Sequence, residues 1–190
     1  MIVAGIDYSL SSPAICVHDG NEWNYKNCTF YYMIKKEKLM DAEKPFIPSM
    51  YPTYDSDMER YHKLSTWSRD IINKHNCKHV FIEGYAFGAV GRVFQIAENA
   101  GLLKYQIWQS GAVMDVFPPT VIKKFGTGKG NANKEKMYDA FFSETGVDIR
   151  DRCGIINHNN WNPVSDIVDS YYIAKYGFEK EKENGNEGAT

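Results

Sequence analysis

Two aspartates stand three residues apart in the segment NPVSDIVDSYYIAKY, residues 162–176, which otherwise has the apolar spacing of a buried helix. Residues at positions i and i+3 of a helix project from one face, so the carboxylates of Asp166 and Asp169 would lie close together and repel each other. Such a pair needs either a solvated surface or a bound cation. The structural alternative is an ordinary helix N-terminus, with Asn162 as the N-cap and Pro163 as the first helical residue, because helix N-termini favour Asp.

Two further acids end apolar runs. Asp7 closes MIVAGID and Glu83 closes CKHVFIEG, and both runs have the composition of buried strands. If these strands are neighbours, all four acids meet at one rim of the sheet. Four carboxylates in one place are costly unless they are neutralised, and hard oxygen ligands of this kind suit Mg²⁺ or Mn²⁺. Two such ions can activate a water and stabilise the departing oxygen of a phosphodiester, so the sequence indicates phosphoryl chemistry.

A basic segment, PTVIKKFGTGKGNANKEKMY at residues 119–138, contains five lysines and one Glu. Its glycines would let backbone amides approach an anion, and its lysines are Lys123, Lys124, Lys129, Lys134 and Lys136. The segment lacks the spacing of a nucleotide-binding P-loop. It therefore suits a nucleic-acid backbone better than a nucleotide, with a merely solvated loop as the alternative.

Aromatic residues follow Glu83 in the segment GYAFGAVGR. Tyr85 and Phe87 stand among small residues and could stack on unpaired bases or wedge into a distorted duplex. Arg92, at the end of this segment, is a further candidate for DNA contact. The structural alternative is that the two aromatic side chains cap the core.

The elements that must position these residues follow the order β-β-β-α-β-α-β-α-α. Asp19-Gly20 between strand-like runs indicates a hairpin, and Ser56 with Glu59 forms a capping box at the first helix. A loop is expected over residues 35–54, further helices over 93–108, from about 133, and over 162–176, and a last strand over 111–117. The expected fold is α/β, with a five-stranded mixed sheet of three antiparallel and then two parallel strands, flanked by helices in the ribonuclease H arrangement.

Composition bounds the class of protein. A chain of 190 residues suits one domain, expected over residues 1–176, and its net charge of −2 excludes a uniformly basic nucleic-acid coat. The tail, residues 177–190, has no apolar period and is predicted to be disordered. The four cysteines contain no C-x-x-C pair and are expected to be reduced and buried. No apolar run is long enough for a membrane span and no basic n-region is present, so we expect a soluble, cytoplasmic protein.

Four motifs occur in an order that resembles RuvC-type Holliday-junction resolvases, particularly their phage and viral branch. They are GIDYSLSSPAICV, VFIEGYAF, VFPPTVIKKFGTGKGNANKEKM and SDIVDSYYIA, and the resemblance spans residues 2 to about 175. It implies a homodimeric, Mg²⁺-dependent endonuclease that nicks two strands symmetrically across a four-way junction, in a bacterial or phage-infected cell.

The resemblance also implies roles for single residues. Asp7, Glu83, Asp166 and Asp169 fall on the family's metal-binding acids. Lys123 and Lys134 fall on lysines that contact DNA or lie near the scissile phosphate, which adds Lys134 to the catalytic candidates. Tyr85 and Phe87 flank the family's junction-inserting aromatic without matching it, and the Pro-rich segment 44–54 has no counterpart in the family.

Three other functions share some of these sequence features. GIDYSLSS also resembles the first phosphate loop of actin-like sugar kinases, but those need two such domains, which 190 residues cannot hold. A non-catalytic junction-binding module is disfavoured because all four acids are present. A related nuclease that acts on flaps, branched replication intermediates or RNA hybrids stays open.

Overall fold

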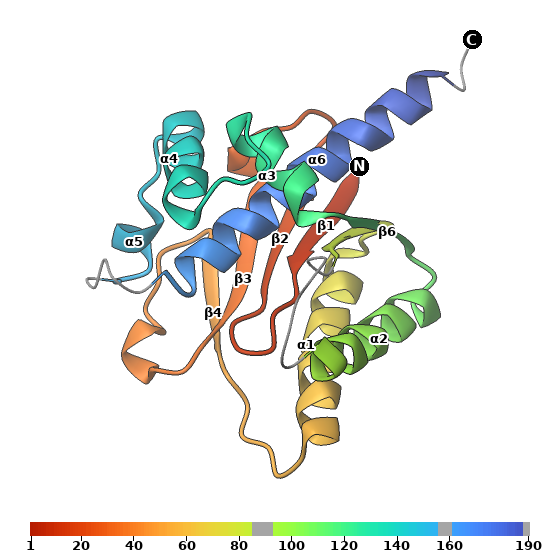
Figure 1. The fold of residues 1–190 in the computed structure, drawn as a ribbon, viewed down its shortest axis with the longest axis vertical. Coiled ribbons are helices and arrows are strands. Elements are labelled where there is room, and N and C mark those ends of the chain that lie inside the picture. Colours follow the sequence, from red (N-terminus) through yellow and green to blue (C-terminus); the bar gives the residue numbers. More distant parts are fainter. Residues whose placement is uncertain (85–92, 156–160, 188–190) are drawn as a thin grey trace.

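The computed structural model describes residues 1–84, 93–155 and 161–187, which form one mixed sheet between two layers of helices (Figure 1). The strands are β1 (Ile2–Asp7), β2 (Ala14–Asp19), β3 (Cys28–Ile34), β4 (Phe46–Met50), β5 (His79–Glu83) and β6 (Val113–Phe117). The helices are α1 (Asp57–His75), α2 (Val93–Gln109), α3 (Pro119–Thr127), α4 (Lys134–Thr145), α5 (Ile149–Arg152) and α6 (Val164–Glu187). Two short 3₁₀ turns, η1 (Tyr25–Asn27) and η2 (Glu37–Leu39), flank β3.

The strands lie in the order β4-β3-β2-β1-β5-β6. β1, β2 and β3 are antiparallel neighbours, as the hairpin signal predicts, while β5 and β6 run parallel to β1. The predicted α/β fold is therefore confirmed, with one more strand than expected. The extra strand is β4, which lies inside the predicted loop 35–54 and pairs in parallel with β3.

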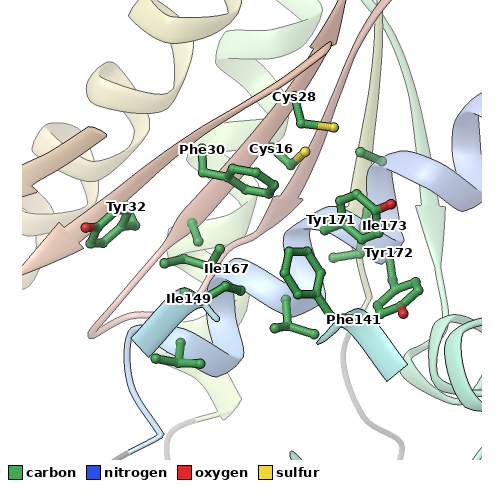
Figure 2. Packing of buried hydrophobic residues seen from close by; sticks show 14 of the residues in the cluster. Cys16, Cys28, Phe30, Tyr32, Phe141, Ile149, Ile167, Tyr171, Tyr172 and Ile173 are labelled. Atoms are coloured by element: carbon green, nitrogen blue, oxygen red, sulfur yellow. The ribbon is translucent and has the colours of Figure 1, made fainter. Parts of the chain in front are cut away.

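The sheet is buried on both faces, because alternate residues of each strand pack on different helices. Val3 and Phe81 belong to the core formed with α3, α4, α5 and α6. Ala4 and Ile82 belong to a second core formed with α1 and α2. Figure 2 shows the first core, where strand residues such as Phe30 face α6 and α4. The side-chain period of two thus assigns each strand residue to one helical layer.

The C-terminal helix is longer than the sequence indicates. α6 begins at Val164, after Asn162 and Pro163, and continues to Glu187 through the segment predicted to be a disordered tail. That prediction is wrong for residues 177–187, because Phe178 is buried and its ring packs on those of His18 and Trp23. Phe178 lies one turn beyond Ala174. Its burial stabilises the helix beyond residue 176, where the apolar spacing of the sequence had indicated that the helix ends.

The basic segment also contains more structure than expected. Its first half is α3, which begins at the Pro-Pro pair and ends at Gly128 with a left-handed φ of 77°. Pro is favoured in the first turn of a helix and Gly just after its end, so the two residues bound a helix where a loop was expected. The second half is α4, which begins close to the predicted start near residue 133 and is capped by Asn133.

Contact between α6 and β1 is made by backbone. A Cβ at Gly5 would lie 2.2 Å from the amide nitrogen of Ala174 and 2.5 Å from the carbonyl oxygen of Ser170. A second close approach occurs at Gly177, whose added Cβ would lie 2.2 Å from the ring of Phe81. The two glycines let α6 lie directly on β1 and β5.

Candidate active site

Two of the predicted acids end adjacent parallel strands. Ile6 pairs with Ile82, so Asp7 and Glu83 follow side by side at the carboxyl ends of β1 and β5. Asp7 shares the side-chain direction of Val3, and Glu83 that of Phe81, both of which face α6. The sheet therefore points both carboxyls toward α6.

The close packing of α6 brings the other two acids to the same place. Gly5 contacts Ser170 and Ala174, and Asp7 lies two residues beyond Gly5, about 7 Å along the strand. Asp166 lies four residues before Ser170, about 6 Å along the helix. Since α6 runs against the direction of β1, Asp166 and Asp169 return to the strand end where Asp7 lies.

Burial raises the pKa of all four carboxyls. The pKa of Asp7 is held well above its usual range by burial first, and then by the charges of Asp166, Glu83 and Asp169. Burial likewise raises the pKa of Glu83 to about 7, that of Asp166 to about 6 and that of Asp169 to about 8. The four carboxyls thus form one electrostatic cluster.

Asp7 and Asp166 interact directly within this cluster. Asp7 and Asp166 share a side-chain hydrogen bond, which requires a proton on one carboxyl. The second carboxylate oxygen of Asp166, Oδ2, is buried and has no hydrogen-bond partner. Across the described ranges, no three Asp, Glu, His or Cys side chains lie in an arrangement that could hold a metal ion as it stands. The orphaned oxygen and the set of four hard donors nevertheless fit a divalent cation, which would replace the protons.

Two of the five candidate lysines belong to the acid cluster. The charge of Lys123, on α3, opposes the raised pKa of Glu83 and of Asp169. Lys134, the first residue of α4, has the same effect on Asp166 and Asp169. The structure therefore brings both lysines that match the resolvase motif to the four acids.

The other three lysines of the basic segment lie further out. Lys124 is exposed on α3. Lys129 and Lys136 line a hollow of about 570 Å³ that Asp139 and Glu144 also line. These lysines present charge to solvent around the site without entering it.

A hydrogen-bond chain that the sequence analysis did not identify links the acids to Lys134. The hydroxyl of Ser12 hydrogen-bonds Asp166, and Asn162 Nδ2 donates to Ser12 Oγ at 2.8 Å. Lys134 Nζ in turn donates to Asn162 Oδ1 at 3.3 Å. Asn162 was assigned as an N-cap, but its carbonyl oxygen accepts from Lys134 and from the hydroxyl of Ser165. Ser12 belongs to the motif GIDYSLSS, and this motif was the sequence feature that could have indicated its place at the site.

Three candidates for DNA contact lie outside the described residues: Tyr85, Phe87 and Arg92. Their roles stay predictions. All four cysteines are free and buried, as predicted. In the part of the chain that the structure describes, no helix has the length and apolar character needed to cross a membrane.

Sequence comparison identifies one curated relative. The chain is 27% identical over 97 residues to crossover junction endodeoxyribonuclease RuvC of Synechococcus sp. (strain CC9311). The alignment covers 51% of this chain and 61% of the relative, so somewhat less than two thirds of the relative's length is matched. No protein-family model matches the chain.

Structural comparison extends the similarity over nearly the whole chain. Thermus thermophilus RuvC superposes with a TM-score of 0.61 at 14% identity, over 96% of this chain and 97% of that one. The same enzyme in complex with a Holliday-junction substrate gives 0.62 at 15% identity, over 92% and 90%. Fowlpox virus resolvase in complex with its junction DNA gives 0.52 at 14% identity, over 95% and 98%. The chain has the fold of RuvC-type resolvases, as the motifs predicted.

Proposed function

We propose that the protein is a Mg²⁺-dependent endodeoxyribonuclease that resolves four-way DNA junctions by paired, symmetric nicks. The observation that supports this proposal is the electrostatic grouping of Asp7, Glu83, Asp166 and Asp169 near one strand end, with the charges of Lys123 and Lys134 acting on them. The similarity to crossover junction endodeoxyribonuclease RuvC supports the choice of substrate. The nuclease domain, expected over residues 1–176, is proposed to extend to residue 187 because α6 continues that far, and the cytoplasm of a bacterial or phage-infected cell is the proposed location.

The four acids would hold two Mg²⁺ ions, and Mn²⁺ should substitute for them. Bound ions of this kind activate a water and stabilise the departing oxygen of a phosphodiester. The chain's own contribution is to keep the four carboxyls desolvated and close. Ser12 orients Asp166 through its hydroxyl hydrogen bond. Asn162 holds the Lys134 ammonium group beside the acids, where it would contact the scissile phosphate.

DNA would be bound along the basic segment. Lys123 and Lys134 lie at the acids, whereas Lys124, Lys129 and Lys136 extend the positive charge outward over α3, the turn that follows it and α4. Lysines that contact phosphates release counterions from DNA, and this release drives binding without regard to sequence. Tyr85, Phe87 and Arg92 are proposed to contact the crossover, where unpaired or unstacked bases are accessible.

A homodimer would supply two active sites related by a two-fold axis, as symmetric nicking requires. The outer face of α2 supports this assembly because it exposes large apolar side chains. Phe94 is 80% exposed and Trp108 is 70% exposed. Tyr105 stacks on Trp108 with ring centroids 6.0 Å apart. Aromatic residues of this kind are enriched in protein interfaces, and α2 is therefore the proposed dimer surface.

The decisive experiment incubates the purified protein with labelled four-way junctions, flaps, linear duplexes and RNA–DNA hybrids, with and without Mg²⁺. We expect paired nicks at symmetric positions in the junction, only when Mg²⁺ or Mn²⁺ is present. Preferential cutting of flaps or hybrids would instead assign the protein to a related nuclease. Junction binding without any cleavage would identify a non-catalytic junction-binding module.

A further inference from the structure

A hollow of about 480 Å³ opens beside the acid cluster and plays no part in the mechanism above. It lies between the segment that follows β3 and the segment that precedes α6. Ser12 and Asn162 line it, and the same two side chains link Asp166 to Lys134. The hollow therefore shares a wall with the candidate active site.

The walls of the hollow combine apolar and basic side chains. Leu39, Ile155 and Pro163 provide apolar surface in the hollow, and of these Ile155 and Pro163 are buried. Lys35, Lys36 and Lys38 also line it, and all three lysines are exposed at its rim; neither an acid nor an aromatic residue is among its described lining residues. Its volume lies within the range of sites that enclose small organic ligands, about 300–1,000 Å³. An anionic ligand with one flat apolar part matches this combination.

A nucleotide has both features, since its base has an apolar face and its phosphate carries charge. A paired base keeps its faces in the stack, so only an unpaired or extruded nucleotide can enter such a hollow. We propose that the hollow binds one unpaired nucleotide of the DNA strand next to the scissile phosphate. The base lies against Leu39, Ile155 and Pro163, and Lys36 and Lys38 contact the flanking phosphates. The position of that nucleotide beside a scissile phosphate rests on the proposed nuclease function.

The concave shape of this site distinguishes it from the basic segment. The lysines of α3 and α4 lie on helix surfaces that a duplex backbone can reach, whereas Lys36 and Lys38 surround a concavity with an apolar interior. Lys35 also contacts an aromatic ring outside the hollow, because its ammonium group lies 5.1 Å from the centroid of the Tyr51 ring. A substitution of Lys35 would therefore change more than the hollow. Lys36 and Lys38 are therefore the clearer targets for substitution.

The first test measures binding of fluorescein-labelled oligothymidylate by anisotropy in EDTA, so that no cleavage occurs. A matched oligonucleotide of the same length with abasic residues reports backbone attraction alone. The wild-type protein should bind the thymidylate at least about 10-fold more tightly than the abasic strand, because bases contribute where they pack on protein. Equal affinity for the two strands would overturn the proposal.

The matched variants separate this hollow from general surface charge. The double variant Lys36→Glu/Lys38→Glu should weaken thymidylate binding by about 10-fold or more, because two phosphate contacts become repulsive. The control is Lys26→Glu, an exposed lysine in η1, at the opposite end of β1 and β2 from the acids. Its effect should stay within about 2-fold. An equal loss in the control would reject the assignment, and thermal melts verify that each variant is folded.

The second test places 2-aminopurine at successive positions around the crossover of a four-way junction. Its fluorescence should rise on binding of the wild-type protein at one position near the nick, since the described lining of the hollow has no aromatic ring to quench it. The double variant should abolish that rise. Absence of a rise at every position, with the junction bound, would contradict base entry. If the junction is not bound at all, the proposed function fails, and the oligonucleotide assay still decides whether the hollow binds a nucleotide.

Discussion

The two faces of the sheet differ in how their helices approach it. On one face, α6 makes backbone contact with β1 at Gly5, and at Gly177 its backbone lies against the ring of Phe81 on β5. On the other, α1 and α2 are kept apart from the strands by apolar side chains, among them Leu64 and Leu103. Polar groups are also buried on the second face: Gln106 Nε2 donates to Ser65 Oγ at 3.2 Å, and Asn99 is buried with no hydrogen-bond partner for its side-chain amide among the described residues.

Close packing and buried charge occur together on the α6 face for a physical reason. Helix and strand backbones in contact leave no room for side chains between them, so groups at the strand end are forced together at the edge of that contact. Asp7 and Asp166 are brought together in this way, at a cost that the surrounding apolar core must offset. The comparison thus separates two proposed roles, with the proposed chemistry on the α6 face and the proposed assembly surface on α2.

The largest effect is expected when one carboxylate is removed from the α6 face. Asp7→Asn or Glu83→Gln should lower junction cleavage at least about 1,000-fold, as expected when an essential catalytic group is lost. Junction binding, measured by gel shift, should be retained because the lysines are unchanged. The matched control is Asp70→Asn, an exposed acid on α1 that pairs with Arg69. Full cleavage by the Asp7 variant would refute the metal-site assignment.

A second change tests the backbone contact directly. Gly5→Ala should destabilise the protein by about 3 kcal/mol or more, because the new Cβ meets the backbone of Ala174 and Ser170. The control is Gly101→Ala on α2, where no atom lies within 4 Å of the added Cβ. Since Ala is a better helix former than Gly, this control should raise stability by up to about 1 kcal/mol. Urea unfolding of both variants measures the difference, and equal stabilities would contradict the packing argument.

The third prediction concerns pH and the metal-free cluster. The pKa of Asp169 is raised from its usual value near 3.8 to about 8, so folding favours the protonated carboxyl. The stability gained from this carboxyl is complete below about pH 4 and is lost as pH rises toward about 8. The metal-free protein should therefore melt at a lower temperature at pH 8.5 than at pH 5.5, and Mg²⁺ should reverse this loss by binding the folded form.

The variant Asp169→Asn sharpens that prediction. It should melt at an equal or higher temperature than wild type without metal, respond less to pH and to Mg²⁺, and cut junctions poorly. An acid on a merely solvated helix face would give wild-type melting and cleavage in this variant. Thermal melts at the two pH values, run beside a cleavage assay, distinguish these outcomes.

The smallest effect on the folded monomer is expected on the outer face of α2. Trp108→Ser should change the stability of the monomer by no more than about 0.5 kcal/mol, because the side chain is 70% exposed, yet it should weaken the dimer. Met50→Ser, 46% exposed on β4 at the other edge of the sheet, is the control and should leave the dimer intact. Light scattering that finds only monomer for the wild type, with and without DNA, would contradict the proposed assembly.

Local patterns in the sequence predict the strands and acids well. An apolar run that ends in an acid places Asp7 and Glu83 at strand ends, and an i, i+3 pair places Asp166 and Asp169 on one helix face. These are short-range features, and the fold class then determines that the strands are neighbours. The joint placement of the four acids was predictable for that reason.

Features that depend on tertiary contacts were missed. β4 contains Pro48, which argues against a strand unless it lies at a sheet edge, and its edge position depends on pairing with β3. The end of α6 depends on Phe178 reaching His18 and Trp23, which are distant in sequence. The link from Ser12 to Asn162 spans 150 positions and has no local signal.

Pro48 has a consequence for the behaviour of the protein at high concentration. An exposed edge strand offers unpaired amide and carbonyl groups on which another chain can add a strand, and this is a common origin of aggregation. Proline lacks the amide hydrogen, so β4, with Pro48 at its third position, is a poor template for such addition. The edge of the sheet that carries β4 is thereby protected against growth into fibrils.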